Sequence, residues 1–566
     1  MKFSQMPYER ITYEEFEVIA GQLLDKMTSA ETFEDAMNTV YEYSKYGDKI
    51  STAISLAYVR NTLNTLDEFY ATEKEYYDEV MPKVQNLDVG FRMALYNSKF
   101  KDELRAKLGD LIFTNIEILM KSFDPKIIPH MQEENRLVNE YDKLMASAQI
   151  EFDGQTLNLA QLGKYKQSTD RTVRKSAYEA EASFYLAHSD EFDKLYDDLV
   201  AIRTKMAREL GYENFVELGY YRMTRNSYTK DDVAKFRKYV KEYIVPIASE
   251  LKKEQKERIK VEDQFMLYDD PLVFLSGNAK PKGDAEKIFE NGKQMYSELS
   301  PETEEFMDFM LENELFDVIS RKGKSVGGYC TSFPEYKAPF IFANFNGTSG
   351  DIDVLTHEAG HAFAGFLARD FEISDHRSPT LEACEVHSMS MEFFTWPWME
   401  LFFKEETDKY KYAHLAGALT FIPYGTIVDY FQHLVYENPD MTPDERKETW
   451  KKLEAEYMPY MSTEDMPFFG DGRYWQRQHH IYSSPFYYID YCLAQTVALE
   501  FWAETQLDYD KAWQKYLKLT QRGGKDTFTG LIEKAGLENP FEPEALKKIA
   551  SIAKKWLEAF DKTKLD

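Results

Sequence analysis

The chain has 566 residues, of which 43% are hydrophobic and 15% aromatic, so it can bury a large core and is not disordered as a whole. Its 98 acidic and 69 basic residues give a formal net charge of −29, which repels phosphate backbones and argues against nucleic acid as a partner. With three cysteines, no apolar secretory segment and no bilayer-length apolar stretch, the sequence predicts a cytoplasmic protein without a disulfide framework or a membrane partner.

Most of the chain is predicted to be helical, because Gly and Pro are sparse and helix start signals recur. Capping boxes begin predicted helices at Thr12 and Thr442, and the second has Pro at its first helical position. The expected fold class is therefore mainly α. We place a domain boundary near residue 190.

Strand patterns are few. The segment Ala148–Leu157 alternates around Asp153-Gly154, which predicts a small hairpin. Further along, Gly328–Ser332 and Pro339–Asn344 are two extended runs joined by residues of turn composition. If the second run is an edge strand, a peptide can pair with it through main-chain hydrogen bonds.

An HExxH motif extends from His357 to His361, in a chain that has only ten histidines. Since Asp351–Arg369 is predicted to be a helix, the two imidazoles lie one turn apart on one face and can reach one zinc ion at about 2.0–2.1 Å. Glu358 lies beside them and is suited to be the general base that takes a proton from a zinc-activated water. Leu367 occupies the position where metzincins have their third histidine, so that class is excluded.

A third metal ligand is expected from the next helical stretch, where Glu385, Ser388 and Glu392 share one face. Glu385 is the candidate ligand, since His₂Glu leaves a fourth position open, as catalytic zinc requires. Glu392 is a candidate acceptor that orients a ligand imidazole. A dense run of Tyr and His over 479–491 supplies candidate donors for the oxyanion of a tetrahedral intermediate.

Together these motifs resemble the thimet-oligopeptidase-like zinc metallopeptidases, specifically their oligoendopeptidase F and Pz-peptidase branch. The specific resemblance covers about residues 327–491, with looser similarity back to about residue 150. Ser483-Ser484-Pro485 stands where thimet-type members carry a Gly-Gly loop, and this departure is similar to the oligoendopeptidase F branch. The motifs that carry the resemblance are Gly327-Gly-Tyr329, the run Pro339–Asn344, the HExxH motif, Glu385-Val-His-Ser388 with Glu392, and the stretch from His480 to Tyr491.

The resemblance implies one Zn²⁺ per chain, held by His357, His361 and Glu385, with Glu358 as the base. It also implies that two residues stabilise the transition state and that four contact the substrate. The transition-state residues are His480 and Tyr491. The substrate-binding residues are Tyr488, Ala343, Gly328 and Tyr329.

The fold that the resemblance implies has two helical halves around a deep substrate channel, with a small β-sheet next to the zinc helix. Residues 1–190 then form an N-terminal helical domain and residues 191–566 a zinc metallopeptidase catalytic domain. Because a site inside such a channel excludes folded proteins, the expected function is a cytoplasmic zinc endo-oligopeptidase that cleaves short peptides internally. The oligomeric state is left open.

Other functions remain alternatives. A helical zinc carboxypeptidase can share HExxH and a downstream glutamate, but only an endopeptidase cuts peptides that are blocked at both ends. A peptide-binding scaffold with a structural metal normally has four protein ligands, whereas three are found here. A zinc aminopeptidase is less favoured because the chain has no Gly-x-Met-Glu-Asn segment.

Overall fold

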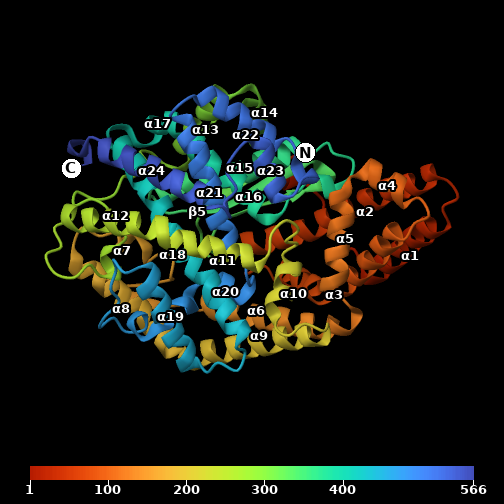
Figure 1. The fold of residues 1–566 in the computed structure, drawn as a ribbon, viewed down its shortest axis with the longest axis horizontal. Coiled ribbons are helices and arrows are strands. Elements are labelled where there is room, and N and C mark those ends of the chain that lie inside the picture. Colours follow the sequence, from red (N-terminus) through yellow and green to blue (C-terminus); the bar gives the residue numbers. More distant parts are fainter. Residues whose placement is uncertain (566) are drawn as a thin grey trace.

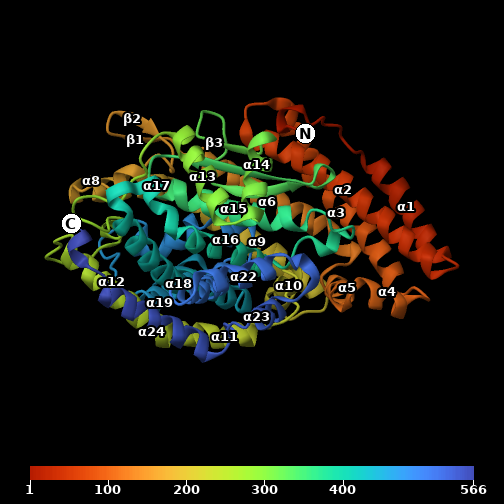
Figure 2. The same ribbon diagram turned by 90° about the horizontal axis from the view of Figure 1, so that it is seen from above.

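The computed structural model describes residues 1–565, and helices dominate it, as predicted. The N-terminal helices gather at one end of the molecule, coloured red to orange on the right of Figures 1 and 2. They build two apolar clusters beside the main core, one of which also includes Ile373. These helices are α1 (Tyr13–Ser29), α2 (Phe33–Leu63), α3 (Glu68–Tyr96), α4 (Lys101–Leu108) and α5 (Asp110–Ser122).

The remaining helices build a larger body around one continuous apolar core. The predicted domain boundary near residue 190 stays a prediction, and a helix begins at Ser189. The helices of this body are α6 (Ile128–Ala146), α7 (Gly163–Lys166), α8 (Arg171–Ala187), α9 (Ser189–Glu209), α10 (Phe215–Arg222), α11 (Lys230–Tyr239), α12 (Val245–Arg258), α13 (Ala285–Leu299), α14 (Pro301–Glu312), α15 (Gly350–Ala368), α16 (Leu381–Phe394), α17 (Met399–Phe403), α18 (Thr407–Glu437), α19 (Pro443–Tyr457), α20 (His479–Ser483), α21 (Ile489–Thr505), α22 (Tyr509–Thr520), α23 (Phe528–Ala535) and α24 (Pro543–Ala559).

Both predicted capping boxes are confirmed. The Thr12 hydroxyl accepts a hydrogen bond from the Glu15 amide at 3.3 Å, while the Glu15 carboxylate accepts one from the Thr12 amide at 2.7 Å. Thr442 and Glu445 make the same pair of bonds at the start of α19. These bonds satisfy amide groups that the first turn of a helix leaves without an intrahelical partner.

The predicted hairpin is confirmed as β1 (Ile150–Phe152) and β2 (Gln155–Leu157). Asp153 and Gly154 have φ of 52° and 69°, the left-handed pair that a two-residue hairpin turn requires. None of the helices within residues 1–565 combines the length and the apolar character that crossing a membrane requires.

The second sheet has three strands in the order β3 (Phe316–Ile319), β5 (Ala338–Phe345) and β4 (Tyr329–Phe333). Strand β5 pairs in parallel with β3 and antiparallel with β4. The conditional expectation that Pro339–Asn344 is an edge strand is therefore wrong, because β5 has a neighbour on each side. Strands β3 and β4 are the two edge strands instead.

Helix α15 packs against this sheet and against α16, and α16 packs in turn on α21; their labels meet near the centre of Figure 1. Gly360 makes the close approach of α15 and α16 possible. A Cβ atom there would lie 2.6 Å from the Ser388 Cα and 2.7 Å from the His387 carbonyl oxygen, closer than real Cβ atoms come. This contact brings the middle of α15 onto the middle of α16.

Candidate active site

Helices α15 and α16 bring together the three predicted metal ligands. His357, His361 and Glu385 each offer a ligand atom within 4.8 Å of the others. The Glu385 Oε2 atom lies 3.2 Å from the His357 Nε2 atom and 3.4 Å from the His361 Nε2 atom. Ligands that bind a tetrahedral zinc at about 2.0–2.1 Å are ~3.3 Å apart, so these three residues fit zinc. No fourth Cys, His, Asp or Glu within residues 1–565 joins the group.

The Glu385 carboxylate is buried and held from two sides. Tyr487 donates its hydroxyl to Oε1 at 2.5 Å, and the Ser388 hydroxyl donates to Oε2 at 3.0 Å. Burial alone would raise the pKa of Glu385, but the charge of His361 and the hydrogen bonds from both imidazoles hold that pKa well below 4.5. The carboxylate is therefore ionised, as a metal ligand must be.

A chain of three hydrogen-bonded side chains, Glu392, His414 and Trp396, supports His357 on the side away from Glu385 Oε2. Trp396 donates its indole N–H to the His414 Nδ1 atom at 3.1 Å, so the other ring nitrogen of His414 carries the proton. That nitrogen lies 2.8 Å from Glu392 Oε2, and the His357 Nδ1 atom lies 2.7 Å from Glu392 Oε1. With Glu392 accepting from both rings, His357 turns the lone pair of Nε2 toward the candidate metal position.

Glu358, the predicted base, is 7% exposed, and its Oε2 atom has no hydrogen-bond partner among residues 1–565. Burial is the main cause that raises the pKa of Glu358 above its ordinary 4.5. It faces the start of the edge strand, since a Cβ on Gly328 would lie 3.7 Å from Glu358 Oε1. A buried carboxylate oxygen without a protein partner keeps its lone pairs free to accept a proton.

The predicted oxyanion donors His480 and Tyr491 lie on α20 and α21. The Tyr491 hydroxyl is 3.4 Å from the His480 Nε2 atom, and the Gln478 side-chain Nε2 atom is 2.9 Å from His480 Nδ1. Burial lowers the pKa of His480 to about 4 and, with the negative charge of Glu385, raises that of Tyr491. At neutral pH the imidazole is therefore uncharged and the phenol keeps its proton.

The other residues that are predicted to bind the substrate differ in their surroundings in the folded chain. The Tyr488 ring lies 5.0 Å, centroid to centroid, from the His480 ring. Tyr329 instead bonds through its hydroxyl to Thr62 Oγ1 of α2 at 2.6 Å, which ties the sheet to the N-terminal helices. Ala343 is buried in the central strand, and its carbonyl accepts a hydrogen bond from Lys324, so it does not offer the edge that peptide pairing needs.

Three residues of this region escaped the sequence analysis. Tyr487 lies within the tyrosine-rich run, but nothing in the run distinguishes it from Tyr488 as the partner of Glu385. His414 and Trp396 belong to no motif, and only their hydrogen bonds in the folded chain reveal their connection to the site.

Three cavities lie in a row between the N-terminal helices and the site. The first, about 310 Å³, is lined by Tyr487, Leu381 and Arg222 among others. Arg222 also lines a second cavity of about 310 Å³, which shares Gln85 and Met131 with a third of about 650 Å³. The shared lining residues place the three cavities next to one another, and the substrate channel stays a prediction.

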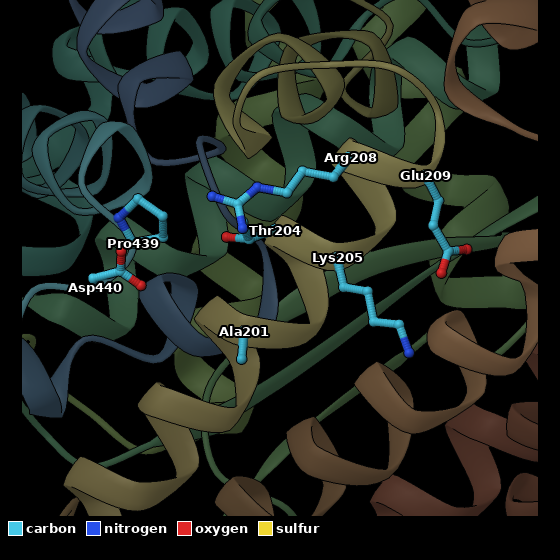
Figure 3. A pocket seen from close by; sticks show the side chains of 7 residues that line it. All are labelled: Ala201, Thr204, Lys205, Arg208, Glu209, Pro439 and Asp440. Atoms are coloured by element: carbon cyan, nitrogen blue, oxygen red, sulfur yellow. The ribbon is translucent and has the colours of Figure 1, made fainter.

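A further cavity, of about 430 Å³, opens on α9 away from these residues (Figure 3). Its wall carries Arg208 and Lys205 on one side and Asp440 on the other. None of its lining residues belongs to the candidate site.

Comparisons with known proteins agree with this geometry. Residues 3–123 match the model of the peptidase M3 N-terminal domain, and residues 164–551 match that of peptidase family M3. No match was found among the curated proteins.

Solved structures resemble the chain over its whole length. A Pz peptidase A structure with an inhibitor is 48% identical, has a TM-score of 0.97, and the match covers 99% of this chain and 100% of that one. A crystal structure assigned as oligoendopeptidase F has the same identity and TM-score, with 99% of both chains covered. One from Bacillus anthracis, with the same assignment, is 45% identical with a TM-score of 0.93, covering 100% of this chain and 99% of that one.

These matches confirm the resemblance found in the sequence and the two-part helical fold that it implied. The chain belongs to peptidase family M3 and is a metalloendopeptidase.

Proposed function

We propose that this enzyme is a zinc-dependent endo-oligopeptidase that hydrolyses internal peptide bonds of short peptides and holds one Zn²⁺ per chain. The observation that carries the proposal is the position of Glu385 Oε2, 3.2 and 3.4 Å from the Nε2 atoms of His357 and His361. In our proposal these three side chains are the ligands. Glu392, supported by His414, then fixes the tautomer of His357.

Glu358 is the general base in this proposal. Zinc, when bound, supplies a Lewis acid that brings the pKa of a water to about 7 and polarises a carbonyl group. The orphaned Oε2 atom of Glu358 takes the proton of the attacking water, and the same carboxyl group then returns it to the leaving amine. Its raised pKa, caused chiefly by burial, makes it a stronger base than an exposed glutamate and suits it to both transfers.

His480 and Tyr491 are the proposed donors to the oxyanion of the tetrahedral intermediate. Both side chains carry hydrogen-bond donors, and burial keeps Tyr491 protonated. Donors that are already oriented stabilise the charge that develops in the transition state more than the substrate's neutral carbonyl group. Their contribution is therefore expected in turnover more than in substrate binding.

The substrate peptide is proposed to lie along β4. Within residues 1–565 no backbone hydrogen bond joins the outer edge of β4 to another element, so its outward amide and carbonyl groups are open to an extended peptide. Gly328, just before the strand, places that edge beside Glu358. Main-chain pairing recognises many sequences, which suits an enzyme for short peptides of varied sequence, and we propose that it works in the cytoplasm.

The test is cleavage of a peptide set that is blocked at both ends, with products identified by mass spectrometry. The wild-type enzyme should cut internal bonds in a zinc-dependent way. Glu358→Gln should keep its zinc and lose activity by a factor of about 10³ or more, whereas the surface variant Glu17→Gln should match wild type. Cleavage of peptides with a free carboxyl end alone would instead establish a carboxypeptidase.

A further inference from the structure

We infer that the 650 Å³ cavity between α1–α3 and the far end of β4 is a specificity pocket for a large apolar side chain of the substrate. This side chain belongs to the residue four positions N-terminal to the scissile bond. The inference rests on the proposed function and gives the N-terminal helices a role in substrate selection.

Strand β4 connects the candidate site with the cavity. Its first end follows Gly328, which faces Glu358, and Ser332 and Pro334 at its other end line the cavity. A strand rises about 3.3 Å per residue, so Gly328 and Ser332 are ~13 Å apart. In a peptide paired with the outer edge of β4, the residue about four positions from the reacting bond therefore lies beside the cavity.

The direction of the peptide follows from the same pairing. Antiparallel pairs are the more stable kind, so the peptide is expected to run opposite to β4. Because β4 runs from the site toward the cavity, an antiparallel peptide runs from the cavity toward the site. The residue that reaches the cavity then lies on the N-terminal side of the scissile bond.

The chemistry of the wall indicates what the cavity accepts. Its charged groups neutralise one another: Arg92 pairs with Asp88 at 2.9 Å and with Asp375 at 2.7 Å, and Arg377 pairs with Asp48. The rest of the wall is largely aromatic and aliphatic, so it offers surface for burying an apolar side chain but no unpaired charge for recognising a charged one. The apolar wall includes Phe16, Leu23, Tyr43, Tyr46, Ile50 and Phe91.

Gly47 of α2 offers a way to fill the cavity without disturbing the fold. It lines the cavity, its backbone is helical, and a Cβ atom built on it meets no atom within 4 Å. Gly47→Phe therefore places a ring in open space, while Gly47→Ala adds one methyl group and is the matched control. Neither change touches the candidate metal ligands or Glu358.

The experiment compares two blocked peptides that differ only at the fourth position before the scissile bond, with Phe in one and Gly in the other. For wild type and Gly47→Ala, kcat/KM should be at least about tenfold higher for the Phe peptide, as expected for burial of a large side chain. Gly47→Phe should bring this ratio close to one. A third peptide with two residues before the scissile bond should be cut equally by all three proteins.

The inference is overturned if the Phe-to-Gly ratio is near one in wild type. It is also overturned if Gly47→Phe leaves the ratio unchanged, or if the preference lies on the C-terminal side of the bond. Equal thermal unfolding of the three proteins controls for misfolding. Failure of the proposed function has a different signature, since then no blocked peptide, including the short one, is cut by wild type.

Discussion

The Nδ1 atom of His357 lies 2.7 Å from the Oε1 atom of Glu392, a residue 35 positions later in the chain and on a different helix. The other carboxylate oxygen of Glu392 meets His414 Nε2 at 2.8 Å. Both imidazoles thus converge on one largely buried carboxylate, and this fixes which nitrogen of His357 is free to bind a metal.

Glu392→Gln should weaken zinc binding by about 10–100-fold, because an amide replaces one accepting oxygen with a donor and disturbs the orientation of His357. Competition with a chromogenic chelator measures the zinc dissociation constant directly. Glu400→Gln, at an exposed position of α17, is the control. An unchanged zinc affinity in Glu392→Gln would show that this carboxylate does not support the metal site.

Tyr487→Phe should also weaken zinc binding, by several-fold, because Glu385 Oε1 loses the hydroxyl that donates to it at 2.5 Å. Tyr488→Phe is the matched control, since the adjacent hydroxyl makes no hydrogen bond to Glu385. The same chelator titration distinguishes the two variants. If both bind zinc as wild type does, Tyr487 has no positioning role.

Tyr491→Phe should lower kcat by a factor of about 10²–10³ while KM changes much less, because its hydroxyl is expected to bond the oxyanion mainly in the transition state. Steady-state kinetics with a blocked peptide give both constants. Tyr212→Phe, away from the site, should retain the wild-type values. A rise in KM with unchanged kcat would instead make Tyr491 a substrate-binding residue.

The carboxyl group of Glu500 is expected to make the free energy of unfolding depend on pH. Burial raises its pKa from 4.5 to about 7, so the folded protein keeps this proton over a range where the unfolded chain has lost it. The stability that protonation gives is therefore present below about pH 4.5 and is lost as pH rises toward 7.

Glu500→Gln, which imitates the protonated form, should raise the free energy of unfolding at pH 8 by roughly 1–3 kcal/mol and leave it nearly unchanged at pH 4.5. Its side-chain oxygen can still accept the Glu538 amide, which lies 2.9 Å from Glu500 Oε2. Denaturant unfolding at the two pH values is the measurement. The same gain at both pH values would mean that the substitution acts through packing rather than charge.

The spacing of residues in the sequence is sufficient to predict the two helices that carry the candidate metal ligands. The spacing of His357 and His361 requires a helix to bring two imidazoles to one metal, and α15 covers nearly the predicted range. Glu385 and Glu392 are seven residues apart, so one helix face carries both. Local spacing along one helix determines these relationships, which is why the sequence alone predicts them.

The pairing of segments that are distant in the sequence cannot be predicted from a local sequence pattern. Strand β3 has four residues and pairs in parallel with β5, and no local pattern indicates such a distant partner. For that reason the sequence leaves open an edge position for β5, which is the central strand of the folded sheet. His414 likewise lies 22 residues from Glu392 on another helix, and only the packing of α18 brings the two together.

The central claim is that one zinc ion is held by His357, His361 and Glu385 with a fourth position left open. Crystals of the wild-type enzyme, with anomalous diffraction recorded on both sides of the zinc absorption edge, test it most directly. The account predicts a single zinc peak at about 2.0–2.2 Å from both Nε2 atoms and from Glu385 Oε2. A peak elsewhere, no zinc peak in active crystals, or a fourth side chain on the ion would contradict it.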